Sequence, residues 1–133
     1  MRAITMILIF AMTTAATASA KPHLRDVREI DGLLIEVRVA DKIRKKCDSI
    51  SARFIRANSL VYGLKDKARQ MGYTEQEIDA YINSQADHDR QRELRNAYMV
   101  ARGVDSKIPE TYCVLGKAEI EKGSQIGALL RMN

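Results

Sequence analysis

Aromatic residues and cysteines are scarce in this sequence. Among its 133 residues there is no tryptophan, and there are only two phenylalanines and two cysteines. Proteins that bind single-stranded nucleic acid stack bases on aromatic rings, so this shortage disfavours a nucleic-acid partner. No C-x-x-C-H run is present, which excludes a covalently attached c-type haem. The sequence therefore predicts no cofactor and no nucleic-acid binding.

Long apolar runs are also missing, apart from one short run near the N-terminus. It extends from Ile4 to Met12, about half of the roughly 20 apolar residues that a membrane-spanning helix needs. The run follows Met1-Arg2 and leads into the small residues AATASA before Lys21, which is the pattern of a secretory signal. We expect residues 1–20 to be a signal peptide that is cleaved after Ala20. Residues 21–133 would then form a single periplasmic domain without a transmembrane segment.

The two cysteines, Cys47 and Cys113, have different interpretations inside and outside the cytosol. In an oxidising compartment two lone cysteines usually pair, and a bond between them would close a loop of 66 positions. The chain-entropy estimate for such a loop is roughly 4 kcal/mol. The alternative is a redox-active or nucleophilic cysteine, but there is no C-x-x-C motif and no base is placed to activate a thiol. We therefore predict a structural disulfide.

Apolar residues recur in alternating steps of three and four from Ile30 to Met71, which indicates a helical stripe. Asp48 and the serines beside it compete for backbone amides, and such clusters favour caps and turns. We therefore predict one helix over roughly residues 31–47 and a second over roughly residues 51–71.

Helix signals continue through the second half of the chain. Thr74 and Glu77 form a capping box that begins a third helix, which we expect to reach Gly103 despite a polar middle, ADHDRQRE. Pro109 suits the start of a fourth helix that ends near Gly123. No alternating run is bounded by hairpin turns. The predicted fold is all-α, a small helical bundle of about four helices stapled by one disulfide.

Two groups of polar residues were considered as sites of chemistry. Asp87-His88-Asp89 contains ligand types, but neighbours in a helix point about 100° apart and do not converge on one ion, so a solvated charged face is expected. His23 lies at the start of the mature chain. Glu119 is the one glutamate between apolar neighbours, and a carboxylic acid held protonated in a cleft can cleave glycans. A hydrogen-bonded or exposed Glu119 is the simpler interpretation, and we predict no catalytic residue and no metal site.

Charge is unevenly distributed along the chain, whose net charge is +5. Basic residues outnumber acidic ones by ten to three from Arg38 to Arg69, whereas five acids and no Lys or Arg occupy Glu75 to Asp89. One interpretation is complementarity between neighbouring helices or simple solubility. The other is a basic surface for an acidic partner protein or an anionic membrane surface. The candidate partner-binding residues are Lys42, Lys45, Lys46, Arg53 and Arg56.

Several motifs together resemble a known family. They are the Ser-Ile-Ser that follows Cys47 closely, the runs GYTEQEIDAYI and AYMVARGV, and the C-terminal YCVLGKAEIEKGSQIGALLR. They are similar to a family of small exported proteins of photosynthetic and marine alphaproteobacteria, classed as a domain of unknown function. The resemblance implies a periplasmic location and the same cysteine pairing. It implies no activity.

Two classes of function follow from these residues. The first is a non-enzymatic binding or interaction module that would bind its partner through the basic segment. The second is an acid- or stress-activated periplasmic chaperone that exposes apolar surface when its paired carboxylates become protonated. A cell-wall-acting enzyme is a third and weaker interpretation.

Overall fold

A computed structural model describes residues 20–133 of the chain, and the predicted signal peptide therefore lies outside the described residues except for Ala20. The described part is predominantly helical, with six α-helices, one 3-10 turn and a two-stranded sheet. The predicted all-α class is confirmed. The elements are η1 (Leu24–Asp26), α1 (Arg28–Lys46), β1 (Ile50–Ala52), α2 (Phe54–Gln70), α3 (Glu75–Ile82), α4 (Gln85–Val100), α5 (Glu110–Lys122), α6 (Gln125–Ala128) and β2 (Leu130–Met132).

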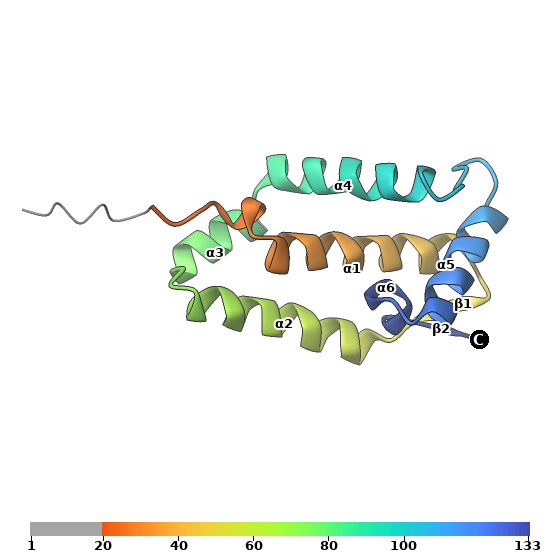
Figure 1. Ribbon diagram of the computed structural model, residues 1–133, viewed down its shortest axis with the longest axis horizontal. Helices are drawn as coiled ribbons and strands as arrows, with labels where there is room; N and C mark the ends of the chain where they lie inside the picture. Colours follow the sequence, from red (N-terminus) through yellow and green to blue (C-terminus); the bar gives the residue numbers. More distant parts are fainter. Residues whose placement is uncertain (1–19) are drawn as a thin grey trace, which may run out of the picture.

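Helix α1 is the centre of the molecule. Figure 1 shows it running between α2 and α4, with α5 crossing near its C-terminal end and α3 near its N-terminal end. Contacts with α2, α4, α5, α6 and η1 surround it. Every residue of α1 from Ile30 to Arg44 is accordingly buried or half-buried. A helix that is covered on so many sides fixes the places of the shorter elements around it.

The third predicted helix is in fact two helices. Helix α3 begins at the predicted capping box, in which the Thr74 hydroxyl accepts from the amide of Glu77, and it ends at Ile82. Ser84 then caps α4, because its hydroxyl accepts a hydrogen bond from the amide of Asp87. A serine at this place offers the backbone a new helix start, which the periodicity of the apolar residues does not register.

The small sheet was not predicted. β1 and β2 pair antiparallel, with Ile50 opposite Met132 and Ala52 opposite Leu130. Each strand has three residues, which is too short for an alternating pattern to stand out in a sequence. The pairing joins the link between α1 and α2 to the last residues of the chain.

The buried residues form two clusters at opposite ends of α1. The larger, called here the stapled core, contains the disulfide between Cys47 and Cys113, which confirms the predicted pairing. The smaller, called here the N-terminal cluster, joins η1, the start of α1, α2 and α3. The stapled core comprises Val39, Ala40, Ile43, Cys47, Ile50, Met99, Val104, Tyr112, Leu115, Ile126, Leu129 and Leu130. The N-terminal cluster comprises Leu24, Val27, Ile30, Ala68, Tyr73, Ile78 and Tyr81.

Candidate functional site

The structure distributes the five predicted partner-binding residues over more than one surface. Lys42 is half-buried on α1 and lines a cavity with residues of α4 and α5. Lys45 forms an ion pair with Asp41, at 2.7 Å between Nζ and Oδ2, and Lys46 is exposed at the end of α1. Arg53 and Arg56 lie together at the start of α2 and line a different groove.

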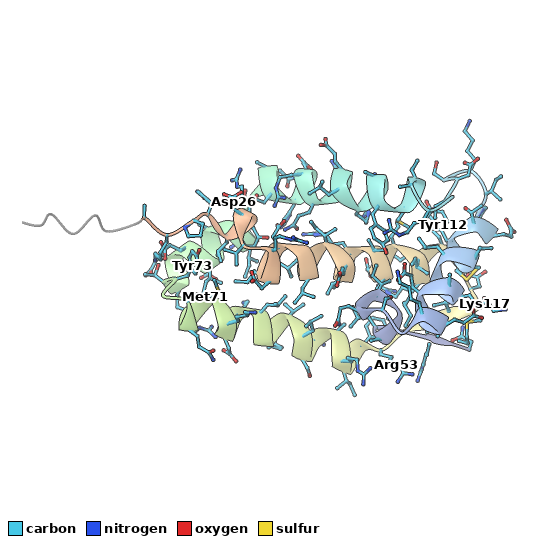
Figure 2. The ribbon with its side chains drawn as sticks, viewed as in Figure 1. Asp26, Arg53, Met71, Tyr73, Tyr112 and Lys117 are labelled. Atoms are coloured by element: carbon cyan, nitrogen blue, oxygen red, sulfur yellow. A yellow bond between two sulfur atoms is a disulfide. The ribbon has the colours of Figure 1, made fainter. Side chains whose placement is uncertain are left out.

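Arg53 and Arg56 are held in place by carbonyl groups near the C-terminus. Arg53 Nε donates a hydrogen bond to the Leu130 carbonyl at 3.1 Å, and Arg56 Nη1 donates to the Ala128 carbonyl at 3.2 Å. Figure 2 shows Arg53 at the end of α2 that lies next to the β-strands. Each guanidinium carries five N–H donors, so each has further donors to offer a partner.

Apolar side chains stand beside these arginines. Ile55 is 86% exposed and Phe54 is 59% exposed. One guanidinium, that of Arg44, lies over the Phe54 ring at 5.0 Å from its centroid. A groove of about 590 Å³ runs along this region, and no acidic residue lines it. We call it the α2 surface, and its residues are Ala52, Arg53, Phe54, Ile55, Arg56, Ser59 and Arg131.

Sequence reasoning found only part of the α2 surface. Phe54 was assigned to the apolar stripe that faces the core, and its exposure shows that assignment to be wrong. Arg131 was missed because it is 75 positions away from Arg56 in the chain and reaches the groove only through the pairing of β2 with β1. Phe54 and Ile55 are consecutive, so their side chains point about 100° apart on a helix. This angle was the available signal in the sequence that the two side chains cannot be equally buried.

A buried ion network lies between α1, α3 and α4. Asp31 is 5% exposed and accepts hydrogen bonds from Tyr81 at 2.5 Å and from Gln91 at 2.8 Å. The two terminal nitrogens of Arg90 donate to its two carboxylate oxygens at 2.5 and 3.1 Å. Burial alone would raise the pKa of Asp31, but the hydrogen bonds from Arg90, Tyr81 and Gln91 outweigh it and lower that pKa. The network joins α1, α3 and α4 at this end of the bundle.

The expectation of a solvated face at Asp87-His88-Asp89 is wrong for Asp87. Its side chain is buried, between Arg25 at 3.3 Å and Arg90 at 3.4 Å. His88 places its Nε2 atom 2.6 Å from the carbonyl oxygen of Ile82. Across residues 20–133, no three His, Cys, Asp or Glu side chains gather in a geometry that would hold a metal ion.

Glu119 is buried and fully engaged, not poised as an acid. Its carboxylate accepts hydrogen bonds from the Tyr98 hydroxyl at 2.7 Å and from the Ser124 hydroxyl. Burial would raise the pKa of Glu119, but these two donors lower it overall, so the group is ionised. Burial, and after it the hydrogen bond to Glu119, raise the pKa of Tyr98 to about 12.

Glu36, which sequence reasoning missed, is the acid with a raised pKa. Burial raises the pKa of Glu36, and the nearby charge of Glu119 raises it further. Its Oε2 atom is buried and has no hydrogen-bond donor within the described residues. No signal in the sequence separates Glu36 from the other glutamates of the chain, because Glu119 lies 83 positions away and only the packing of α5 on α1 brings the two together.

No helix within residues 20–133 combines the length and apolar character that crossing a membrane requires. No curated protein and no solved structure matches the chain. One family model does match, over residues 22–131, which is nearly all of the described part. On that match, the chain belongs to a family of unknown function (DUF5333).

Proposed function

We propose that the protein is a non-enzymatic interaction module of the periplasm, which binds an acidic partner protein through the α2 surface. In this proposal residues 1–20 are a signal peptide cleaved after Ala20, and the disulfide between Cys47 and Cys113 supports an oxidising compartment. The observation that carries the proposal is that three arginines line the same groove as the exposed side chains of Phe54 and Ile55 at the start of α2.

The chemistry of the α2 surface matches a protein interface. Arginine and aromatic residues are enriched in the energetically important parts of such interfaces. The guanidinium groups of Arg53 and Arg56 are positioned by backbone carbonyls, so less side-chain entropy is lost when they bind a carboxylate. Ile55 supplies a side chain that a partner can bury. An acidic surface with an apolar depression would complement both features.

A protein partner fits better than an anionic membrane. Electrostatic attachment to lipids typically uses clusters of four to eight flexible basic residues, and the α2 surface has three arginines, two of which are fixed by hydrogen bonds. Bidentate pairing with carboxylates depends on fixed geometry, whereas attraction to a lipid surface does not. We therefore commit to a protein whose contact surface carries Asp or Glu side chains.

The test compares two variants that carry the same charge change at different places. Ile55→Glu combined with Arg56→Glu alters the α2 surface. Val114→Glu combined with Lys117→Glu makes the same two changes on the exposed side of α5, where Val114 is 70% exposed. Wild-type and variant proteins are immobilised and exposed to periplasmic extract at low salt and at raised salt. We expect the wild type and the α5 variant to retain the same acidic protein at low salt, and the α2 variant to lose it.

The salt dependence is part of the expected result, because exposed charges are screened beyond about 10 Å at roughly 0.1 M ionic strength. Circular dichroism would first establish that both variants keep the helical spectrum. Retention of the same protein by the α2 variant at wild-type levels would refute the proposed surface. A partner without an acidic contact surface would refute the proposed chemistry.

A second candidate function, an acid-activated chaperone, is favoured by one observation. The Asp31–Arg90 network closes the N-terminal cluster, and the lowered pKa of Asp31 makes that closure dependent on pH. Because the pKa in the folded state is lowered, the stabilisation is present above the unfolded value of about 3.9 and is lost as the pH falls through the folded-state value. Acidification should then expose Tyr73, Ile78 and Tyr81. Dye binding without suppression of client aggregation at acid pH would eliminate this candidate.

A further inference from the structure

A second group of cations lies away from the α2 surface, at the junction of α1, α4 and α5. A cavity of about 250 Å³ opens there, lined by Lys42 of α1, Arg95 of α4 and Tyr112 of α5, among others. Tyr112 is labelled in Figure 2, where it lies at the start of α5. No acidic residue lines this cavity. The pocket therefore brings basic groups from elements that are distant in the sequence to one place.

Neither Lys42 nor Arg95 forms an ion pair within residues 20–133, although the charge of Asp41 acts to raise the pKa of each. On α1, Arg44 and Lys45 both form ion pairs with Asp41, at 2.6 and 2.7 Å, but Lys42 forms none. On α4, Arg90 and Arg92 form ion pairs with acidic side chains, whereas Arg95 Nε and Nη2 donate only to the neighbouring amide oxygen of Asn96. Charged groups that are half-buried without a partner usually cost stability.

The two cations also repel each other. The pKa of Lys42 is lowered by burial first and then by the positive charge of Arg95. Burial lowers the pKa of Arg95 too, and Arg38 and Arg92 lower it further. An anion placed between Lys42 and Arg95 would remove this repulsion and would supply the missing partner to both groups.

Hydrogen-bond donors and an apolar wall complete the pocket. Ser106 and Tyr112 also line the cavity, and each carries a hydroxyl that can donate a hydrogen bond to a ligand. Met99 and Val104 form an apolar side of the same cavity. Its volume is slightly below the roughly 300 Å³ at which sites for drug-sized ligands begin, so the ligand must be small.

We propose that this pocket binds a phosphate monoester, with the phosphate group between Lys42 and Arg95 and its carbon substituent against Met99 and Val104. A phosphate monoester dianion carries the charge that two cations require, whereas a single carboxylate would leave one of them unpaired. The planar fork of Arg95 matches two phosphate oxygens, and Lys42 acts as a point charge. Ser106 and Tyr112 donate to the remaining oxygens. This site shares no residue with the α2 surface, so it stands or falls independently of the proposed function.

The first test measures the melting temperature and the calorimetric affinity of the protein cleaved after Ala20, residues 21–133, with glycerol 3-phosphate and with inorganic phosphate. Glycerol and sodium chloride at the same ionic strength are the reference ligands. We expect both phosphates to raise the melting temperature in a saturable way and both reference ligands to leave it unchanged. Equal effects of phosphate and chloride would overturn the proposal, because they would show only general screening of charge.

The second test uses variants that separate binding from folding. Lys42→Gln and Arg95→Gln should each weaken glycerol 3-phosphate binding at least tenfold, and Tyr112→Phe should weaken it about threefold. Without ligand the first two variants should be as stable as the wild type or more stable, because they relieve repulsion, whereas a purely structural role would make them less stable. Lys65→Gln, at a half-buried lysine of α2, is the matched control and should bind as the wild type does. Wild-type affinity in the Lys42→Gln, Arg95→Gln double variant would refute the site.

A third experiment identifies the source of the phosphate. Vesicles of phosphatidylcholine with and without phosphatidic acid are sedimented with the protein. Binding that needs phosphatidic acid and Lys42, and that glycerol 3-phosphate displaces only weakly, would assign the pocket to a lipid headgroup. Tight binding of glycerol 3-phosphate without vesicle binding would assign it to a free phosphate monoester. If the Arg95→Gln variant keeps both kinds of binding, both assignments are contradicted.

Discussion

The two ends of α1 are closed by different kinds of interaction. At its C-terminal end the stapled core combines a disulfide, a short sheet and tightly packed apolar side chains. At its N-terminal end a smaller apolar cluster is accompanied by the buried pair of Asp31 and Arg90. Apolar packing and a covalent bond hardly respond to pH, whereas a buried carboxylate does. The comparison teaches that one domain can be closed by a covalent bond at one end and by a buried ion pair at the other, although the buried carboxylate of Glu119 gives the C-terminal end a pH response of its own.

The proposed sites follow the same division. The α2 surface and the phosphate pocket both lie beside the stapled core, whose residues Met99, Val104 and Tyr112 also line the pocket. Arg53 ties the α2 surface to β2, and Arg56 ties it to the end of α6. Binding sites on rigid elements keep their geometry, which favours affinity. Protonation of Asp31 would therefore loosen the N-terminal cluster while the disulfide still joins the elements beside both sites.

Removing the disulfide should have the largest effect. We expect Cys47→Ala with Cys113→Ala to lower the free energy of unfolding by about 4 kcal/mol, because the bond closes a loop of 66 positions in the unfolded chain. Chemical denaturation at pH 7 measures the loss, and wild-type protein in reductant should show the same value. Hydrogen exchange should accelerate more in β1 and α6 than in α3. A loss below about 1 kcal/mol would show that packing alone holds the C-terminal end.

Breaking the ion network should have the next largest effect, and only above acid pH. Asp31→Asn removes the acceptor for Arg90, and removing one partner of a buried pair typically costs 3–5 kcal/mol. Because Arg90 is 29% exposed and can reach water, we expect about 2–3 kcal/mol at pH 7. Below the unfolded pKa of about 3.9 the difference from wild type should shrink, because the stabilisation by Asp31 is lost as the pH falls through its lowered folded-state pKa. Asp66→Asn, at an exposed ion pair with Arg69, is the control and should cost under about 0.5 kcal/mol.

Substitutions at two glycines allow the packing density at the two ends of α1 to be compared. A Cβ at Gly116 of α5 would lie 2.5 Å from Ile50 Cδ1 and 2.7 Å from Ile43 Cγ2, so Gly116→Ala should cost about 1–3 kcal/mol. A Cβ at Gly32 of α1 would meet nothing within 4 Å, so Gly32→Ala should stabilise the protein by up to about 1 kcal/mol through helix propensity. Thermal denaturation of both variants checks the pair. Equal effects at both positions would mean that the stapled core is not the more tightly packed end.

Neutralising Glu36 should have the smallest effect and the opposite sign. The pKa of Glu36 is raised by burial and by the charge of Glu119, so the ionised form destabilises the folded state above the unfolded pKa of about 4.3. We expect Glu36→Gln to raise the melting temperature by roughly 1–3 °C at pH 7 and to leave it unchanged near pH 4. A lower melting temperature at pH 7 would show that the carboxylate of Glu36 has a stabilising partner.

Local signals in the sequence predicted several helix starts and stops, although the break between α3 and α4 at Ser84 was missed. Thr74 with Glu77 forms the expected capping box, and Gly123 adopts the left-handed conformation, with φ of 66°, that ends α5. The disulfide followed from the count of cysteines together with the inferred export. These features depend on neighbouring residues or on composition, and both are visible in a sequence.

What the sequence did not reveal depends on contacts between distant segments. The pairing of β1 with β2 joins residues about 80 positions apart through two strands too short to show a pattern. Asp87 looked solvated because one of the two arginines that enclose it, Arg25 of η1, is 62 positions away in the sequence. Lys42 was among the predicted partner-binding residues, but the sequence could not show that it lies near Arg95, because only the packing of α4 on α1 brings the two together. Charge can be counted in a sequence, whereas the absence of a partner for a charge can be seen only in a fold.

The disulfide also determines how the molecule would respond to mechanical force. A pull on the two ends of the described chain is carried through the bond between Cys47 and Cys113, which bypasses α2, α3 and α4. With 66 positions excluded, the oxidised chain would extend roughly 220–240 Å less than the reduced chain, at about 3.3–3.6 Å per residue. In the oxidised protein only the first helix and the C-terminal segment could be drawn out, and the α2 surface would separate into its two parts as β2 left β1. Arg131 would then leave the groove while α2, which lies inside the loop closed by the disulfide, is not stretched.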